Sequence, residues 1–241
     1  MASISLKDVS LTFPVITESG GSLRKKLVKM TTGGAISDDN SKTILINALK
    51  NINLELREGD RVGLIGHNGS GKSTLLRTLA SIYTPTEGQI TISGSVRALF
   101  ELGVGTDHEL TGRANIARLA RLYGYPLEQI EADMGAIEEF SGLGGYLDLP
   151  IRTYSSGMQL RLIFAISTLY PCDILLIDEV FGVGDEAFQI KAKERMESMM
   201  ASSKIVVLAS HSKELIRKFC NKTITLDTGG IAKISAIGEG E

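Results

Sequence analysis

The sequence predicts an α/β fold in which a glycine-rich turn joins a buried strand to a helix. The stretch "DRVGLIG" (60–66) reads as a short buried strand, and "STLLRTLASIY" (73–83) places apolar residues on one face of a helix. Two further apolar runs, "DILLIDEV" (173–180) and "KIVVLASHS" (204–212), predict additional buried strands. With 241 residues and 43% hydrophobic content, the chain is long enough to bury a substantial core in one large α/β domain or slightly more.

The turn after the first of these strands has the spacing of a phosphate-binding loop. Gly66, Gly71, Lys72 and Ser73 fit the pattern G-x-x-x-x-G-K-[ST], in which backbone N–H groups and a helix N-terminus surround nucleotide phosphates. The lysine would reach the β- and γ-phosphates, and the Ser73 hydroxyl would bind Mg²⁺. A glycine-rich turn with a chance lysine is the alternative, which the strand-loop-helix context disfavours. The residues expected to contact the nucleotide are His67, Asn68, Gly69, Ser70, Gly71, Lys72, Ser73 and Thr74.

Composition limits the other functional classes. The formal net charge of −2 gives no reason to expect nucleic acid as a partner, because proteins that bind the phosphate backbone usually carry a basic excess. Cys172 and Cys220 lie in apolar stretches without metal-ligand spacing, which predicts core thiols in a reducing cytosol. The N-terminus has no apolar signal core, and no run approaches the roughly 18 apolar residues that span a bilayer. Any membrane role would therefore depend on a partner.

Alternating strands predict an antiparallel β layer near the phosphate loop. "SISLKDVSLTF" (3–13), "NINLELREGD" (51–60) and "EGQITISGSV" (87–96) alternate apolar and polar residues. Residues 16–46 have a different composition, rich in glycine and lysine, and are predicted to be an insertion. Within it, "GSLRKKLVKM" (21–30) could form a short basic amphipathic helix against a membrane or partner, or a solvated mobile loop.

Helical periodicity predicts that residues 111–145 are mainly helical. A first helix would begin at Thr111 as N-cap and end near Gly124. A second helix would use Ile130, Met134, Ile137 and Phe140 as its apolar face. Stripes of this kind are more often core than cofactor sites.

Two adjacent carboxylates end the strand at 173–180. Asp178 at the sheet edge beside the phosphate loop would supply a Mg²⁺ carboxylate. Glu179 points the other way along the pleat, where it could polarise a water molecule as a general base. A strand end capped by acids is the alternative. His211, just after the strand at 204–212, is either a polar end cap or a contact to the γ-phosphate.

The stretch "TYSSGMQLRLIFAIS" (153–167) adds a second anion site. It opens with Ser155, Ser156 and Gly157 and continues as a helix whose buried face includes Leu160, Phe164 and Ser167. The exposed N-terminus of such a helix attracts anions, and the serine hydroxyls add donors to it.

Together, these motifs in this order resemble the ATP-binding subunit of an ABC transporter over nearly the whole chain apart from the insertion. The resemblance implies a P-loop NTPase fold of the ABC type, with an antiparallel β subdomain and a helical subdomain at 105–160, in a single ATPase domain over 1–241. It implies ATP and Mg²⁺ as cofactors. The residues it assigns are Gly66 to Thr74 as Walker A, Tyr154 to Met158 as signature, Asp178 and Glu179 as Walker B, Asp185 in the D-loop and His211 at the switch position.

Phe13 lies where that family has an aromatic residue that stacks on adenine, although a core phenylalanine is the alternative. Where most members have a Q-loop glutamine, this chain has Glu101, which could touch Mg²⁺ or be only a loop residue. Hydrolysis would depend on Lys72, Glu179 and His211. By family geometry, Ser155, Ser156 and Gly157 would contact ATP bound to the other copy of a homodimer.

A narrower resemblance is to subunits that export bacterial polysaccharides such as O-antigen, capsule or teichoic acid. It depends on "ALFELGVGTDHELTGRANI" (98–116), "TYSSGMQLRLIFAIS" and "DEVFGVGDEAFQ" (178–189), and on Tyr-Ser-Ser-Gly-Met in place of the commoner Leu-Ser-Gly-Gly-Gln. The resemblance implies a lipid-linked polysaccharide as cargo, membrane permease subunits as partners and a place on the cytoplasmic face of the bacterial inner membrane. Because the sequence ends at Glu241, we expect no C-terminal glycan-binding domain of the kind that some members carry.

Three other functions share part of the pattern. A P-loop small-molecule kinase would not need Tyr154 to Met158 or Asp185. A soluble ABC ATPase acting on ribosomes or DNA would more often have two ATPase units or a long coiled-coil insertion. A transporter subunit of the same architecture with a lipid or a drug as cargo is the strongest competitor.

Overall fold

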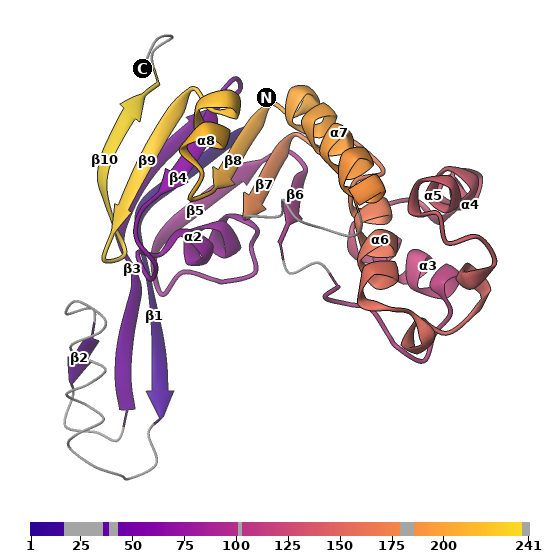
Figure 1. The fold of residues 1–241 in the computed structure, drawn as a ribbon. Helices are drawn as coiled ribbons and strands as arrows, with labels where there is room; N and C mark the ends of the chain where they lie inside the picture. The colour runs from indigo at the N-terminus through magenta and orange to yellow at the C-terminus, as the bar shows by residue number, and fades with distance from the viewer. Residues whose placement is uncertain (17–35, 39–42, 101–102, 179–185, 238–241) are drawn as a thin grey trace. The chain divides into compact units, whose positions relative to one another are not determined.

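The computed structural model describes residues 1–16, 36–38, 43–100, 103–178 and 186–237. The chain divides into two compact units (Figure 1). The sheet unit comprises the described residues within 1–98, 173–179 and 204–241. The helical unit comprises those within 99–172 and 180–203, a range that contains the predicted helical subdomain.

An antiparallel sheet forms the first layer of the sheet unit, as the alternating stretches predicted. Its strands follow the order β2-β3-β1-β5. They are β1 (Ser3–Ile16), β2 (Ile36–Asp38), β3 (Thr43–Arg57) and β5 (Glu87–Ser93). Alternate side chains such as Ile4, Leu6, Leu54 and Leu56 are buried, so one face of the sheet packs into the core.

The ends of β1 and β3 remain paired up to Ile16 and Thr43, and β2 pairs with β3 at residues 44–46. Figure 1 shows these ends running on as a narrow ribbon past β5. Strand pairing therefore reaches both ends of the predicted insertion at 16–46. The basic segment 21–30 lies outside the described residues.

A second sheet of the same unit has the order β10-β9-β4-β8-β7-β6. Its strands are β4 (Arg61–Ile65), β6 (Val96–Leu99), β7 (Ile174–Asp178), β8 (Ile205–Ala209), β9 (Lys222–Asp227) and β10 (Gly230–Ala236). β4, β7, β8 and β9 run parallel, and β10 pairs antiparallel with β9. All five residues of β8 are buried, as expected for a strand inside a parallel sheet. The three apolar runs predicted as strands are confirmed.

Two helices accompany this sheet, α2 (Lys72–Leu79) and α8 (Lys213–Phe219). The Ile216 side chain of α8 lies so close to β4 that a Cβ built on Gly63 would be 2.7 Å from its Cδ1 atom. A glycine at this strand position therefore allows the helix to pack directly on the sheet.

The helical unit contains α3 (Gly112–Leu122), α4 (Leu127–Ala132), α5 (Met134–Ser141), α6 (Ser156–Ser167) and α7 (Glu186–Ser202), with short 3-10 turns at Gly144–Asp148 and Ile151–Thr153. The Thr111 side chain accepts from the N–H of Ala114, which confirms it as N-cap of α3. The core of the unit includes Ile116, Leu119, Ile130, Ile137, Leu147, Leu162 and Ile166, each no more than 1% exposed.

The prediction of a single second helix through Ile130 and Phe140 is wrong in one respect. The structure has two helices there, α4 and α5, and Asp133 lies between them. This residue ends α4 and precedes α5 with φ −92° and ψ 6°. Its carboxylate accepts a hydrogen bond from the Tyr170 hydroxyl. A partner distant in sequence therefore holds the carboxylate of the residue between the two helices.

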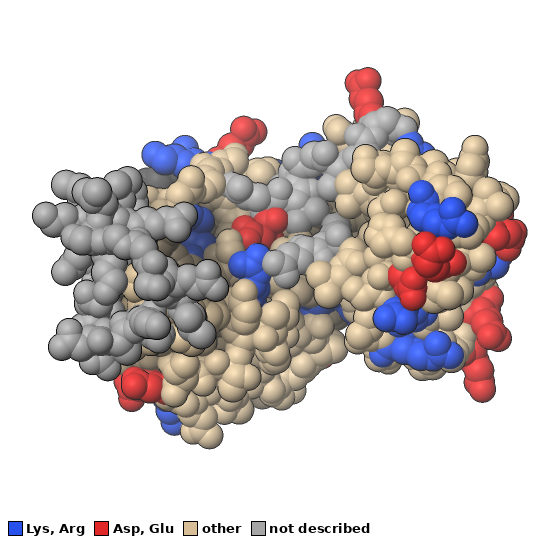
Figure 2. All heavy atoms as spheres, turned by 90° about the horizontal axis from the view of Figure 1, so that it is seen from below, with Lys and Arg blue, Asp and Glu red and all other residues tan. Residues whose placement is uncertain are grey.

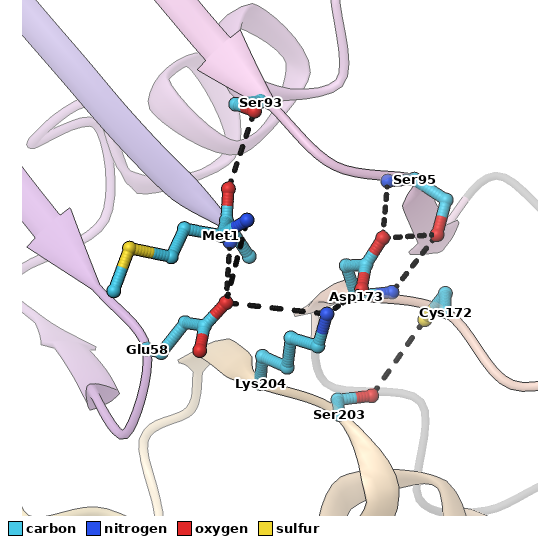
Figure 3. A network of polar contacts seen from close by, with 9 residues as sticks. Met1, Glu58, Ser93, Ser95, Cys172, Asp173, Ser203 and Lys204 are labelled. Carbon is cyan, nitrogen blue, oxygen red and sulfur yellow. Dashed lines mark hydrogen bonds and ion pairs between the residues drawn. The ribbon is translucent and has the colours of Figure 1, made fainter.

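A network of polar contacts lies at the amino ends of β7 and β8 (Figure 3). Asp173 accepts from the N–H and hydroxyl of Ser95, and its other oxygen lies 2.7 Å from the Lys204 ammonium. The hydrogen bond from Lys204 is the main cause that lowers the pKa of Asp173 to about 2, followed by those from Ser95. This carboxylate therefore ties together the segments that lead into β6, β7 and β8.

Cys172 and Cys220 are both buried, each 8% exposed, and neither forms a disulfide, which confirms the expected core thiols. Burial raises the pKa of the Cys220 thiol to about 12. Among the described residues, no helix combines the length and apolar character needed to cross a membrane.

Candidate functional site

The predicted phosphate loop lies between the end of β4 and the start of α2. Gly66, Gly69 and Gly71 have φ values of 151°, 81° and 107°, in the region that favours glycine. A Cβ on Gly66 would lie 2.4 Å from the Leu226 carbonyl oxygen, so a side chain cannot fit there. The loop can therefore curl closely over the end of the sheet, as its sequence spacing predicted.

Lys72 begins α2 and its side chain folds back over the loop. The Nζ atom donates to the carbonyl oxygens of Gly66 at 2.8 Å and His67 at 3.2 Å. Ser73 and Thr74 follow it in the first turn of α2, where backbone N–H groups have no partner within the helix. These N–H groups, the helix dipole and the lysine give the loop a positive character suited to a phosphate.

The other loop residues differ in exposure. His67, Asn68 and Gly69 are exposed, whereas Ser70 is fully buried. The Ser70 hydroxyl has no hydrogen-bond partner among the described residues, while the Ser70 N–H donates to the His67 carbonyl. The buried Ser70 thus stabilises the turn of the loop through this backbone hydrogen bond.

Asp178 is brought to the same edge of the sheet. It is the last residue of β7 and pairs in register with Ala209, the last residue of β8. Because β4, β7 and β8 run parallel, Asp178, the phosphate loop and the segment after Ala209 all follow the carboxyl ends of neighbouring strands. His211 is exposed, two residues beyond Ala209.

The donors at this edge suit a small divalent cation. Ser73 offers a hydroxyl and Asp178 a carboxylate, and Mg²⁺ prefers oxygen ligands, often keeping several waters beside one or two carboxylates. The residues present therefore fit a magnesium ion bound together with nucleotide phosphates.

Phe13 lies near the far end of β1, opposite Ile46 of β3. Its ring is partly buried and meets the ring of Tyr83 edge to face, with centroids 5.2 Å apart and planes at 74°. The guanidinium of Arg77 lies 6.0 Å from the centroid of the Tyr83 ring. The sequence interpretation missed Tyr83, although an aromatic residue soon after the helix of a phosphate loop was a usable signal.

The signature residues lie on the helical unit at the start of α6. The Ser155 side chain caps this helix by accepting from the Met158 N–H at 3.2 Å. The Tyr154 ring is buried, and its hydroxyl donates to the Tyr146 carbonyl. Ser156 is exposed and Gly157 is partly exposed. The predicted N-terminal site of α6 is therefore open to a ligand.

An open groove of about 510 Å³ surrounds these residues, with Tyr146, Leu143, Arg161 and residues 155–158 in its lining. The lining combines the serine residues at the N-terminus of α6 with Arg161, so the groove suits an anion. On the face shown in Figure 2, Lys and Arg side chains lie interspersed with Asp and Glu side chains over the helical unit. Within the helical unit, Arg113 lies 2.8 Å from Asp148 and 3.4 Å from Glu138.

Three predicted site residues, Glu101, Glu179 and Asp185, lie outside the described residues. Their roles stay predictions. Sequence reasoning also missed Asp227, which contacts the phosphate loop from the end of β9 through His67. No local motif marks this residue, because it is 160 positions from its partner.

A family model and similar known proteins point to the same family. The family model described as ABC transporter matches residues 49–182. The chain is 49% identical over 229 residues to the O-antigen export system ATP-binding protein RfbE of Yersinia enterocolitica, which covers 95% of this chain and 96% of that protein. It is 39% identical to the O-antigen export system ATP-binding protein RfbB of Myxococcus xanthus, over 99% of this chain and 54% of that protein.

A third relative is the teichoic acids export ATP-binding protein TagH of Shouchella clausii, 42% identical over 76% of this chain and 51% of that protein. The chain thus spans nearly the whole length of the first relative and about half of the other two. Among solved structures, the ATP-binding cassette MJ0796 bound to ADP and phosphate has a TM-score of 0.68 at 21% identity, covering 98% of this chain and 99% of that one. This likeness identifies the fold.

Proposed function

The chain belongs to the ABC transporter family, and on that premise we propose that it powers export of a lipid-linked polysaccharide across the bacterial inner membrane. Its cargo would be of the O-antigen, capsule or teichoic acid class. The observation that carries the proposal is the 49% identity to an O-antigen export ATP-binding protein over 96% of that protein's length. The sheet-unit geometry supports the ATPase half of the proposal independently.

ATP binds, in this proposal, with its phosphates on the loop at 66–71 and the first turn of α2. Lys72 would exchange the Gly66 and His67 carbonyls for phosphate oxygens, because a charged acceptor forms the stronger hydrogen bond. Ser73 and Asp178 would hold Mg²⁺, which would neutralise part of the negative charge of the phosphate groups. Phe13, placed beside Tyr83, would stack on the adenine ring.

Hydrolysis requires water to attack the γ-phosphorus while the bond to the bridging oxygen of ADP breaks. We assign Glu179 to orient that water and accept its proton, and His211 to contact the γ-phosphate. Lys72 stabilises the negative charge that spreads over the phosphate oxygens. Catalysis in this class of reaction depends mainly on positioning and electrostatic stabilisation. Glu101 would be a further contact to the metal.

A homodimer would complete each site. The groove at the start of α6, with Ser155, Ser156 and Gly157, would face the γ-phosphate of ATP bound to the other copy, and Asp185 would lie at the same interface. The open helix N-terminus and its serine hydroxyls support this assignment. ATP would then favour the closed dimer, and hydrolysis would release it.

The closing motion would pass to membrane permease subunits, which would hold the protein at the cytoplasmic face of the inner membrane. The segment 101–113 is the proposed contact, and its described part exposes Val104 (71%) and Leu110 (37%). The basic insertion is a second candidate. If deletion of residues 20–40 leaves both ATPase activity and export intact, the insertion has no essential part in this coupling.

A gene deletion tests the cargo directly. Surface polysaccharide and lipid-linked glycan inside the cell would be measured after deletion and after complementation with the wild type or with Lys72→Ala. Loss at the surface with internal accumulation, rescued only by the wild type, is the expected result. Unchanged glycan in both places would reject this cargo and favour a lipid or a drug transported by the same kind of subunit.

A further inference from the structure

The ring of His67 in the phosphate loop has a hydrogen-bond partner at each nitrogen. Its Nε2 atom lies 2.9 Å from the Asp227 Oδ1 atom, and its Nδ1 atom lies 2.8 Å from the Asn68 carbonyl oxygen. A carbonyl oxygen only accepts hydrogen bonds, and so does an ionised carboxylate. Both ring nitrogens must therefore carry a proton for both contacts to be hydrogen bonds.

A histidine with two ring protons is a cation, so this arrangement selects the imidazolium form of His67. Among the described residues, the charged groups that face the ring are Asp227 at the end of β9 and Lys72 at the start of α2. The hydrogen bond to Asn68 and then that to Asp227 raise the pKa of His67, while a slight loss of hydration and the charge of Lys72 oppose them. Geometry and electrostatics thus favour the same protonation state.

Asp227 also begins the β9–β10 turn, which holds the phosphate loop by its backbone. The Gly229 N–H donates to the Ser70 carbonyl at 3.1 Å, and the Gly229 carbonyl accepts from the Lys50 N–H at 2.8 Å. A Cβ on Gly229 or on Gly71 would lie 2.9 or 3.0 Å from the Ala48 carbonyl oxygen. The turn, β3 and the loop are therefore in direct contact, and a shift of the turn would move the loop.

We propose that Asp227 is a positioning residue for the nucleotide, which holds His67 in its charged form and the phosphate loop in its binding shape. The imidazolium then forms a second cation beside Lys72 on the phosphate loop. Nucleotide affinity is thereby linked to the proton on His67. This inference rests on the proposed ATP-binding function and adds to it a residue and a protonation state.

The sign of the linkage follows from the charges. Below the raised pKa of His67 the ring is cationic, and a cation in the loop favours a ligand with several negative charges. As the pH rises through that pKa, the ring loses a proton, the hydrogen bond to Asp227 or to Asn68 is lost, and nucleotide affinity falls. Replacing Asp227 by asparagine removes the negative charge and should shift this transition to lower pH.

Nuclear magnetic resonance tests the protonation state directly. The chain has 3 histidines, so the ring nitrogens of His67 can be assigned by the signal that His67→Lys removes. We expect the pKa of His67 in the nucleotide-free protein to lie above its ordinary value of about 6.5 and to fall in Asp227→Asn. A matched control is Glu55→Gln, which removes a carboxylate from the exposed pair with Arg57 elsewhere in the same unit.

Equilibrium binding of a non-hydrolysable ATP analogue with Mg²⁺, from about pH 6 to pH 9, tests the consequence. At a pH where wild-type His67 is charged, we expect Asp227→Asn to raise Kd roughly 1.4-fold to fivefold, the range of an exposed charge pair, because His67 loses the partner that holds it on the loop. His67→Lys keeps a cation that does not titrate in this range, so its Kd should lack the transition. The analogue's own titration is common to all variants and cancels in the comparison.

The outcomes separate this inference from the proposed function. If the wild type binds no nucleotide at any pH, the ATP-binding function itself fails. If the wild type binds nucleotide but Asp227→Asn and His67→Lys each have the same Kd as the wild type at every pH, the inference is overturned and the function stands. A His67 ring that is neutral below its ordinary pKa would also overturn it. ATPase rates should show a raised KM for Asp227→Asn with kcat nearly unchanged, whereas loss of folding would lower both the active fraction and kcat.

Discussion

The Lys72 ammonium lies 2.8 Å from the carbonyl oxygen of Gly66, six residues earlier in the chain. This bond closes the phosphate loop on itself with a cation whose partners are neutral carbonyl groups. Phosphate oxygens form stronger hydrogen bonds with an ammonium group than carbonyls do. The lysine is therefore held in place, and its ammonium group can exchange these carbonyl oxygens for the phosphate oxygens of a nucleotide.

Replacing Lys72 by alanine should abolish most ATP turnover without unfolding the protein. A preorganised donor at a site of developing negative charge is typically worth about 100-fold to 1,000-fold in rate. We expect a loss of that size in steady-state phosphate release, with an unchanged circular dichroism spectrum. Lys7→Ala, at an exposed lysine of β1, is the matched control. Near-normal turnover in Lys72→Ala would exclude the lysine from catalysis.

Gly66→Ala tests the close approach of the loop to β9. The added Cβ would meet the Leu226 carbonyl oxygen at 2.4 Å, and backbone cannot yield as a side chain would. We expect loss of nucleotide binding and a destabilisation of about 1–3 kcal/mol, as for other steric insertions. Gly59→Ala is the control, because Gly59 has φ 92° with open space around its Cβ position. Equal nucleotide affinities in the two variants would contradict the steric argument.

The local parts of this fold and site could be predicted from the sequence. Apolar runs at 61–65, 174–178 and 205–209 identified β4, β7 and β8 as buried strands, because a strand buried on both faces needs nearly continuous apolar side chains. The spacing of Gly66, Gly71 and Lys72 identified the loop, because phosphate binding constrains neighbouring residues. Thr111 identified a helix start by the same local logic.

Contacts between distant residues could not be predicted. Asp227 and His67 are 160 positions apart, and Asp173 and Lys204 meet only because β7 and β8 are neighbours in the sheet. The break at Asp133 interrupts a regular apolar stripe, so periodicity alone could not reveal it. Each of these features depends on how elements pack, which a single sequence does not record locally.

Thr228→Asn should stabilise the protein. Thr228 has φ 45° and Gly229 has φ 84° in the turn between β9 and β10, where Asp227 pairs with Gly230. Two central residues with positive φ suit asparagine and glycine, and the left-handed region costs other residues roughly 1–2 kcal/mol. We expect a gain of up to about 1 kcal/mol in urea unfolding, with ATPase activity kept. Thr225→Asn, in the extended part of β9, should instead destabilise, and the opposite order would contradict the strain argument.

Asp173→Asn should lower stability at neutral pH and lose this effect in acid. The pKa of Asp173 is lowered to about 2, first by Lys204 and then by Ser95. A carboxylate with a depressed pKa stabilises the folded state fully above its unfolded pKa of about 3.9, and that contribution disappears as the pH falls towards 2. We expect a cost of about 1–2 kcal/mol at pH 7, since asparagine can still accept from Ser95.

Urea unfolding of the wild type and Asp173→Asn at several pH values would measure this difference. It should be constant above about pH 5 and shrink below about pH 4. Glu58→Gln is the control, because Glu58 lies 3.9 Å from the same lysine with a longer, weaker contact. A difference that grows on acidification would contradict the role of the Asp173 charge.

Glu179→Gln separates nucleotide binding from hydrolysis. Asp178 ends β7 beside Ala209, at the edge of the sheet that carries the phosphate loop. Glutamine keeps the size of the side chain but cannot accept a proton from water, and general-base catalysis is typically worth about 100-fold to 10,000-fold. We expect ATP to bind with near-normal affinity while phosphate release falls by that factor.

In the presence of ATP, the Glu179→Gln protein should accumulate as a dimer, because the contacts that favour closure are no longer removed by hydrolysis. Size-exclusion chromatography with light scattering would detect this dimer. Asp178→Asn is the comparison, since loss of a proposed metal carboxylate should weaken Mg²⁺-dependent binding as well as turnover. Near-normal ATPase activity in Glu179→Gln would assign the base to another residue.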